Sequence, residues 1–198
     1  MRTRHLIWPL AALWMGLLGA CSKTVTWEEE VPLNTGEVIW VKRSINYKLK
    51  GASGNPLDIA YQPDWIEMLE FNWQGKTYSY TGDAGIMLLA ISPITKFPVL
   101  VARADLKGWD RKNGYKCTNP FYVQFSPDKS GSTWIWPTTI ESWLYESPYN
   151  LMHYRPSFSE GKSKYKLRDR LERDRIVTFQ SPSLIRIDSQ DAFDECKK

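Results

Sequence analysis

Short runs of aliphatic, aromatic and β-branched residues, separated by turn residues, extend from residue 25 to residue 136. Short strands with closely spaced turns are typical of an antiparallel sandwich or barrel. In one run Ile45, Tyr47 and Leu49 share a face and the polar residues between them share the other, as expected for a half-buried strand. We predict strands at residues 25–31, 38–41, 45–49, 66–73, 76–81, 84–91, 97–104, 121–125 and 133–136.

Two features of the sequence predict how some of these strands are arranged. The runs 66–73 and 76–81 are separated only by Gln-Gly, which predicts a hairpin with a tight turn. The runs 84–91 and 97–104 are almost continuously apolar, which predicts a central pair of strands buried on both faces. The stretch 51–63 is predicted to be a loop.

The pattern changes after Pro137. Thr138 and Glu141 have the spacing of a capping box, which predicts a short helix over 139–145. Strong helix formers over 164–175 predict a second helix, and its narrow apolar stripe indicates a surface position. The expected fold is therefore mainly β, an antiparallel sandwich-like single domain with two short helices toward the C-terminus.

The first 20 residues have the features of an export signal. Two arginines precede an apolar stretch of about 15 residues that ends in the small pair Gly-Ala. That stretch is shorter than the ~20 residues that a membrane-spanning helix requires. The sequence Leu18-Gly19-Ala20-Cys21 resembles the lipobox of bacterial lipoproteins. The resemblance implies cleavage before Cys21 and acylation of this cysteine, hence a signal peptide over 1–20 and a lipid-anchored domain over 21–198.

Charge restricts the partners of the mature chain. Loss of Arg2 and Arg4 with the signal lowers the formal net charge from +4 to +2. This mild, interspersed charge offers no footprint for nucleic acid. The most basic stretch, 162–175, has seven basic and three acidic residues. It is either a solvated, salt-bridged helix or a contact with an anionic leaflet beside the anchor.

Few residues of the mature chain carry reactive side chains. Cys117 and Cys196 are predicted to form a disulfide in an oxidising compartment, the alternative being a buried Cys117 and a free Cys196. Cys117 and His153 are the one available nucleophile and base pair, but no motif of Cys-His peptidases surrounds Cys117. A single histidine excludes a multi-histidine zinc site. We expect neither a metal nor another cofactor.

Four acids lie in one neighbourhood of the sequence: Asp64, Glu67, Glu70 and Asp83. Two acids a few ångströms apart are sufficient for a glycosidase. The alternation around Glu67 is compatible with the solvent face of a strand, and Asp83 lies in a Gly-rich turn. We therefore predict no catalytic residues here.

Two pairs of aromatic residues lie on single strand faces. Trp134 and Trp136 form one pair, and Tyr78 and Tyr80 form the other. Flat amphipathic rings of this kind bind sugars or form interface hot spots when they are exposed. One face of any sandwich strand must enter the core, however, so packing is the alternative for all four.

These observations lead to a non-catalytic lipoprotein with a binding or assembly role at the periplasmic membrane surface. Its expected partners are the membrane, through the lipid, and an envelope protein or cell-wall glycan. Two alternatives are an inhibitor or immunity lipoprotein against an envelope toxin and a cell-wall hydrolase. In the lipoprotein family, Ser22 in place of aspartate after the cysteine implies residence in the outer membrane.

Overall fold

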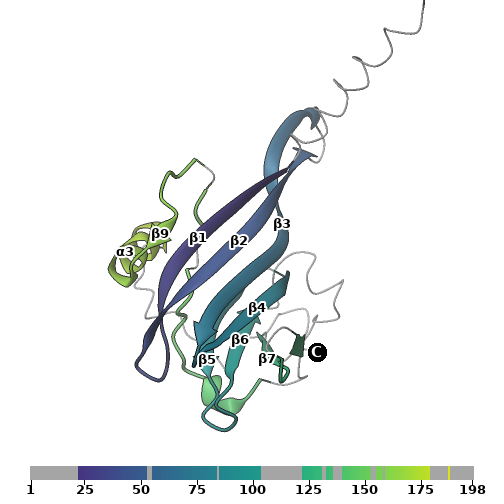
Figure 1. Ribbon diagram of the computed structural model, residues 1–198. Helices are drawn as coiled ribbons and strands as arrows, with labels where there is room; N and C mark the ends of the chain where they lie inside the picture. The colour runs from purple at the N-terminus through teal and green to yellow at the C-terminus, as the bar shows by residue number, and fades with distance from the viewer. Residues whose placement is uncertain are drawn as a thin grey trace, which may run out of the picture.

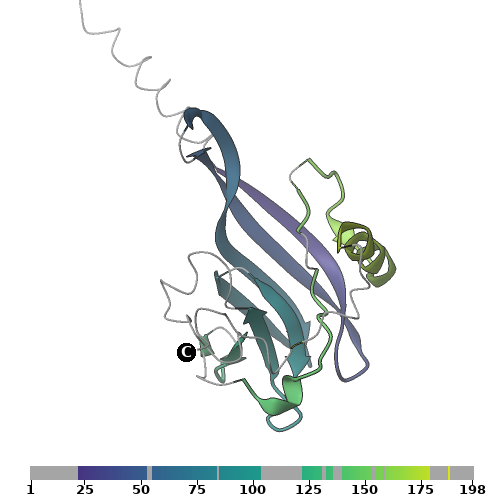
Figure 2. The ribbon, with the colours of Figure 1, turned by 180° about the vertical axis from the view of Figure 1, so that it is seen from behind.

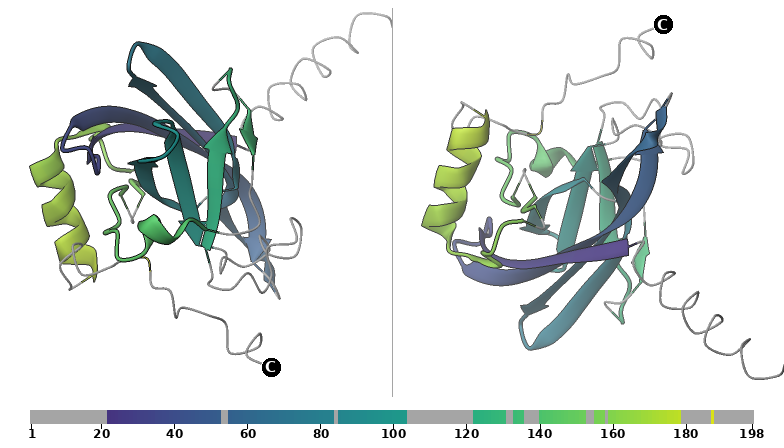
Figure 3. Two further views of the ribbon diagram at one scale, coloured as in Figure 1. Left: turned by 90° about the horizontal axis from the view of Figure 1, so that it is seen from below. Right: turned by 90° about the horizontal axis from the view of Figure 1, so that it is seen from above.

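The computed structural model describes residues 22–52, 55–83, 85–103, 122–130, 133–135, 140–152, 155–157, 159–178 and 187. These residues form a mainly β structure with two sheets (Figure 1). The view from behind shows α3 and β9 at the β1 edge of the first sheet (Figure 2). The views along the vertical axis show the second sheet crossing one face of the first (Figure 3).

The first sheet has the strand order β4-β3-β2-β1-β9. Its members are β1 (Ser22–Pro32), β2 (Val38–Ala52), β3 (Asn55–Trp73), β4 (Lys76–Asp83) and β9 (Lys164–Tyr165). Strands β1 to β4 are joined as successive antiparallel hairpins, whereas β9 pairs with β1 in parallel. The predicted hairpin closes with Trp73 opposite Lys76.

The second sheet has the order β5-β6-β7-β8 and is antiparallel. Its members are β5 (Ile86–Ile91), β6 (Pro98–Arg103), β7 (Tyr122–Pro127) and β8 (Trp134–Ile135). All six side chains of β5 and the first five of β6 are buried. The predicted burial of this pair on both faces is therefore confirmed, but the predicted central position is wrong for β5, which is an edge strand of the second sheet.

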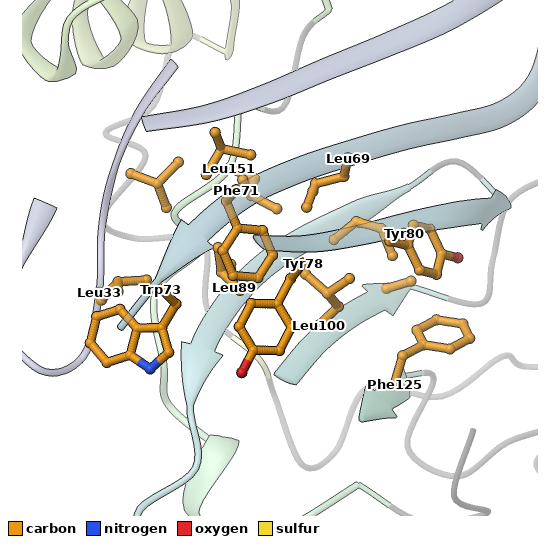
Figure 4. Packing of buried hydrophobic residues seen from close by; sticks show 14 of the residues in the cluster. Leu33, Leu69, Phe71, Trp73, Tyr78, Tyr80, Leu89, Leu100, Phe125 and Leu151 are labelled. Carbon is orange, nitrogen blue, oxygen red and sulfur yellow. The ribbon is translucent and has the colours of Figure 1, made fainter. Parts of the chain in front are cut away.

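The two sheets pack against each other through a large apolar cluster, here called the central core (Figure 4). Side chains of β3 and β4, among them Leu69 and Phe71, meet side chains of β5 to β7, among them Leu89 and Phe125. A second cluster covers the opposite face of β5 and β6 with residues 140–149 and Ile187. Burial on both faces explains the continuous apolar runs in the sequence.

The first sheet is longer than the sequence predicts. Residues 38–41 and 45–49 belong to one strand, β2, and most of the stretch 51–63 is strand in β2 and β3 rather than loop. The ladder continues through register shifts between Ile45 and Tyr47 and between Gly51 and Ala52. Pro63 lies beside the first shift, where a missing amide donor is tolerated.

The described residues contain one α-helix, α3 (Leu167–Thr178), which confirms the second predicted helix with a later start. The first predicted helix is reduced to the 3₁₀ turn η2 (Ser142–Leu144). The backbone amide of Glu141 donates to the side chain of Gln124 on β7, 2.9 Å away. Thr138 of the predicted capping box lies outside the described residues.

Candidate functional site

A layer of charged side chains interrupts the apolar inner face of the first sheet. Its centre is Arg43 on β2, flanked by Glu29 on β1 and Glu67 on β3. Arg43 Nη1 lies 2.8 Å from Glu29 Oε1, and Arg43 Nε donates to Glu67 Oε1. All three side chains are at most 1% exposed. The prediction that Glu67 lies on the solvent face is wrong.

The strand register explains this position. The alternation that buries Leu69 and Phe71 also turns Glu67 inward, and it leaves Ile66 and Met68 more than two-fifths exposed on the outer face. Glu70 lies three residues from Glu67 and is exposed on the outer face. The three described acids therefore do not converge, since Asp64 instead pairs with Lys48 at 2.6 Å. The side chain of Asp83 is outside the described part of the structure.

Two further arginines extend the charged layer. Arg155 Nη2 lies 3.4 Å from Glu67 Oε2, and Arg170 Nη1 of α3 lies 3.5 Å from Glu29 Oε2. Burial acts to lower the pKa of Arg43, but Glu67 and Glu29 outweigh it and hold that pKa above its ordinary value. Burial lowers the pKa of Arg155 despite the attraction of Glu67. Both carboxylates are thus paired with guanidinium groups in the protein interior. Such pairs stabilise the relative positions of the segments that carry these side chains.

The charged layer holds the segment 147–152 against the sheets. Glu29 Oε2 accepts a hydrogen bond from the amide of Met152 at 2.8 Å, and Arg43 Nη1 donates to the Met152 carbonyl at 3.1 Å. Arg170 Nη1 donates to the Asn150 carbonyl. Beyond this layer Met152 packs with Trp27, Ile45 and other residues in a third apolar cluster.

Two asparagine side chains close the outer edge of β5. The Asn150 amide group accepts from Leu89 N at 2.9 Å and donates to Leu89 O at 2.7 Å. The Asn34 amide group bonds Ile91 in the same way, accepting at 2.7 Å and donating at 2.9 Å. Each side-chain amide thus makes the pair of backbone hydrogen bonds that a neighbouring strand would otherwise make. These bonds block the outer edge of β5 from pairing with a strand of another chain.

A groove of about 310 Å³ lies over this edge, between α3, β5 and the turn after β1. This volume is at the lower end of the range for small ligand sites. Leu171 at its border is 40% exposed, whereas Arg170 beside it is 2% exposed. The remaining lining residues are mostly apolar: Pro32, Leu33, Asn34, Leu88, Ala90, Ser147, Pro148, Tyr149, Asn150 and Leu167.

The groove suits an apolar occupant. Its asparagine side chains already bond the backbone of β5, and the Arg170 guanidinium bonds Asn150 and approaches Glu29. A sugar would require hydrogen bonds in exchange for those it loses to water. Sequence reasoning missed the groove because its walls come from four separate segments.

Three residues of the predicted aromatic platform are described, and they pack inward. Tyr78 and Tyr80 are each 3% exposed and belong to the central core. Trp134 is partly buried, contacts the Tyr80 ring edge-on at 5.9 Å and donates from Nε1 to the Ser79 carbonyl at 2.5 Å. These three rings are therefore packed against the rest of the fold and do not form an exposed binding platform. Trp136 is outside the described residues.

Several predicted residues fall outside the described structure, namely Cys21, Cys117, Cys196 and His153. Lipidation of Cys21 and the Cys117–Cys196 disulfide therefore stay predictions. Among the described side chains, no group of three or more His, Cys, Asp or Glu is placed to hold a metal ion. Within the same residues no helix is long and apolar enough to cross a membrane.

Comparison of the chain with protein-family models, with curated proteins and with solved structures finds no match.

Proposed function

We propose that this chain is a lipid-anchored, non-catalytic binding protein of the bacterial envelope, and that its groove receives apolar side chains of an envelope protein. The groove carries the proposal. It combines an exposed leucine, Leu171, with a floor of buried apolar residues such as Leu88 and Ala90. Apolar grooves with a few polar residues at the border are typical of binding sites.

The chemistry favours a protein over a cell-wall glycan as the partner. A glycan presents many hydroxyl groups, and each one buried without a partner is costly. An apolar side chain gains about 1.5–3 kcal/mol on full burial without needing a hydrogen bond. The groove has room for a few such side chains, on the scale of a hot spot.

The anchor puts binding at the membrane surface. The lipobox ends at Cys21, and β1 begins at the next residue, Ser22. A domain attached in this way has almost no tether, so its reach is limited to its own length. Ser22 after the cysteine supports an outer-membrane location facing the periplasm.

A photoreactive apolar residue at position 171 tests the groove in living cells. We expect it to form one protein adduct, and the same residue at position 135, an exposed site on β8, to form none. Pro148 is an exposed residue of the groove, so the variant Pro148→Arg places a bulky cation there. This change should reduce the position-171 adduct about tenfold, which corresponds to about 1.4 kcal/mol. Equal adducts from both positions, or none, would contradict the proposal.

The variant Cys21→Ser tests the anchor. We expect it to lose fatty-acid labelling and to retain the signal, because the acylated sulfur is absent. Full labelling of Cys21→Ser would show that the lipid is attached elsewhere or that the lipobox is not used.

A further inference from the structure

The β2–β3 hairpin projects beyond the rest of the fold at the end of the first sheet where β1 begins (Figure 1). Ser22 pairs with Lys48, and Lys23 pairs with Tyr47. Further out the hairpin continues with Leu49 opposite Tyr61 and Gly51 opposite Ile59. The outer part of the hairpin is therefore next to the first residue after Cys21.

This part of the hairpin has one apolar face. Leu49, Tyr61 and Ile59 share a face, because residues opposite each other, or two apart, lie on the same side of a sheet. Leu49 is 41% exposed and Ile59 is 56% exposed. The cluster around Met152 covers the same strands as far as Tyr47, and Leu49 and Ile59 lie past it.

Lysines lie on both faces of this part of the hairpin. Lys23, opposite Tyr47, shares the apolar face, and its Nζ lies 4.7 Å from the centre of the Tyr61 ring. Lys48 and Lys50 alternate with Leu49, are exposed and lie on the opposite face. Lys48 pairs with Asp64 at 2.6 Å and is still 53% exposed. Exposed apolar residues bordered by lysines are the composition of a surface that lies in the interface of an anionic bilayer.

We propose that this hairpin surface (Lys23, Lys48, Leu49, Lys50, Ile59 and Tyr61) docks on the anionic lipid bilayer to which the chain is anchored. The inference rests on the proposed lipidation of Cys21. The apolar side chains enter the boundary between headgroups and acyl chains, while the lysine stems extend toward lipid phosphates. Docking at two points, the acyl chains and the hairpin, fixes the orientation of the domain on the membrane.

The basic helix α3 is less well placed for this contact. Lys164, just before α3, pairs with Glu28, six residues along β1 from Ser22 and therefore about 20 Å from its start. Lys164 also forms an ion pair with Glu28 at 2.8 Å, and Lys162 forms one with Asp169 at 2.7 Å. These pairs agree with the solvated, salt-bridged helix rather than a leaflet contact.

The test uses the full lipidated chain in phosphatidylethanolamine vesicles, with and without phosphatidylglycerol. A polarity-sensitive fluorophore is attached through Leu49→Cys, and through Ile94→Cys as a control at a 77% exposed turn. The chain without an added cysteine gives the labelling background. We expect phosphatidylglycerol to reduce iodide quenching at position 49 about threefold or more, because an interfacial side chain lies about 5–10 Å below the surface. Quenching at position 94 should stay unchanged.

Matched charge variants complete the test. Combined substitution of Lys23, Lys48 and Lys50 by Gln should remove most of the protection at position 49. The same change at Lys162, Lys164 and Lys166 should leave it intact. A chain that floats with the vesicles but is quenched equally at positions 49 and 94 overturns the docking and leaves the anchor standing. A chain without fatty acid contradicts the anchor and, with it, this inference.

Discussion

The two ends of the first sheet use the same strands in different surroundings. At one end β3 packs on the second sheet, and Leu69 and Phe71 are at most 2% exposed. At the other end Leu49 and Ile59 lie on the same inner face and are about half exposed. Between them lies the charged layer around Arg43. An alternating apolar pattern therefore does not by itself identify a core strand. The apolar face of a strand is buried only where another part of the protein covers it.

The charged layer separates these ends, and disrupting it should have the largest effect on stability. Arg43→Leu removes the guanidinium between the buried carboxylates of Glu29 and Glu67 and leaves them the longer contacts with Arg170 at 3.5 Å and Arg155 at 3.4 Å, so we expect a loss of about 3–5 kcal/mol in the free energy of unfolding. Urea denaturation of the chain measures this loss. Lys42→Leu, an exposed change on the opposite face, is the control. Equal losses in the free energy of unfolding for the two variants would mean that the charged layer contributes no more to stability than an exposed position does.

The packed end should respond strongly to loss of volume. Leu69→Ala removes a 1% exposed side chain from the central core, and we expect a loss of about 2–5 kcal/mol in the free energy of unfolding. The spread depends on how far Phe71 and Leu89 collapse into the cavity. A loss below about 1 kcal/mol by urea denaturation would mean that the sheets are not closely packed at this site.

The capped edge of β5 should come next. Asn150→Ala removes three hydrogen bonds, to Leu89 N, Leu89 O and Pro32 O, so we expect a loss of about 2–3 kcal/mol in the free energy of unfolding. The uncovered edge should also increase association, measured by light scattering. Asn72→Ala, on an exposed part of β3, is the control. A variant as stable and monodisperse as this control would show that the amide cap is dispensable.

The attachment of α3 should weaken in acid. Desolvation acts to raise the pKa of Glu160, but hydrogen bonds from Arg173 and from the Ser157 amide outweigh it, so this pKa is lowered. A lowered carboxyl pKa gives stability that is present at neutral pH and lost as the pH falls through the folded-state value. Glu160→Gln should therefore cost about 1 kcal/mol near neutral pH and nothing in acid. A difference independent of pH would exclude this ion pair as its cause.

Local alternation predicted the parts of the fold that depend on neighbouring residues. The β3–β4 hairpin and the buried pair β5 and β6 follow from turn residues and apolar runs. The continuity of β2 did not, because Arg43 interrupts the apolar pattern and finds its partners 14 and 24 residues away. The inward position of Glu67 was not predicted for the same reason, because its partner Arg43 is distant in the sequence. A charged residue inside an alternating strand is compatible with either face until its partner is known.

The candidate site was less predictable than the fold. Asn34 lies between the first two predicted strands, but nothing local indicates that its amide caps Ile91, 57 residues away. Asn150 and Arg170 give no sequence signal, because their roles depend on how the segment 147–152 and α3 dock on the sheets. The resemblance to a lipobox, by contrast, is carried by four adjacent residues. Sites assembled from distant segments need the tertiary structure.

The exposed hairpin should give the smallest change in stability, and this sharpens the comparison of the two ends. Leu49→Ala removes the same atoms as Leu69→Ala, but from a side chain that is 41% exposed, so we expect a change within about 0.5 kcal/mol in the free energy of unfolding. Urea denaturation in the absence of lipid measures it. If the loss instead approached that of Leu69→Ala, another part of the chain would cover Leu49 in solution, and the two ends would both be core. A small loss leaves Leu49 available for a contact outside the fold.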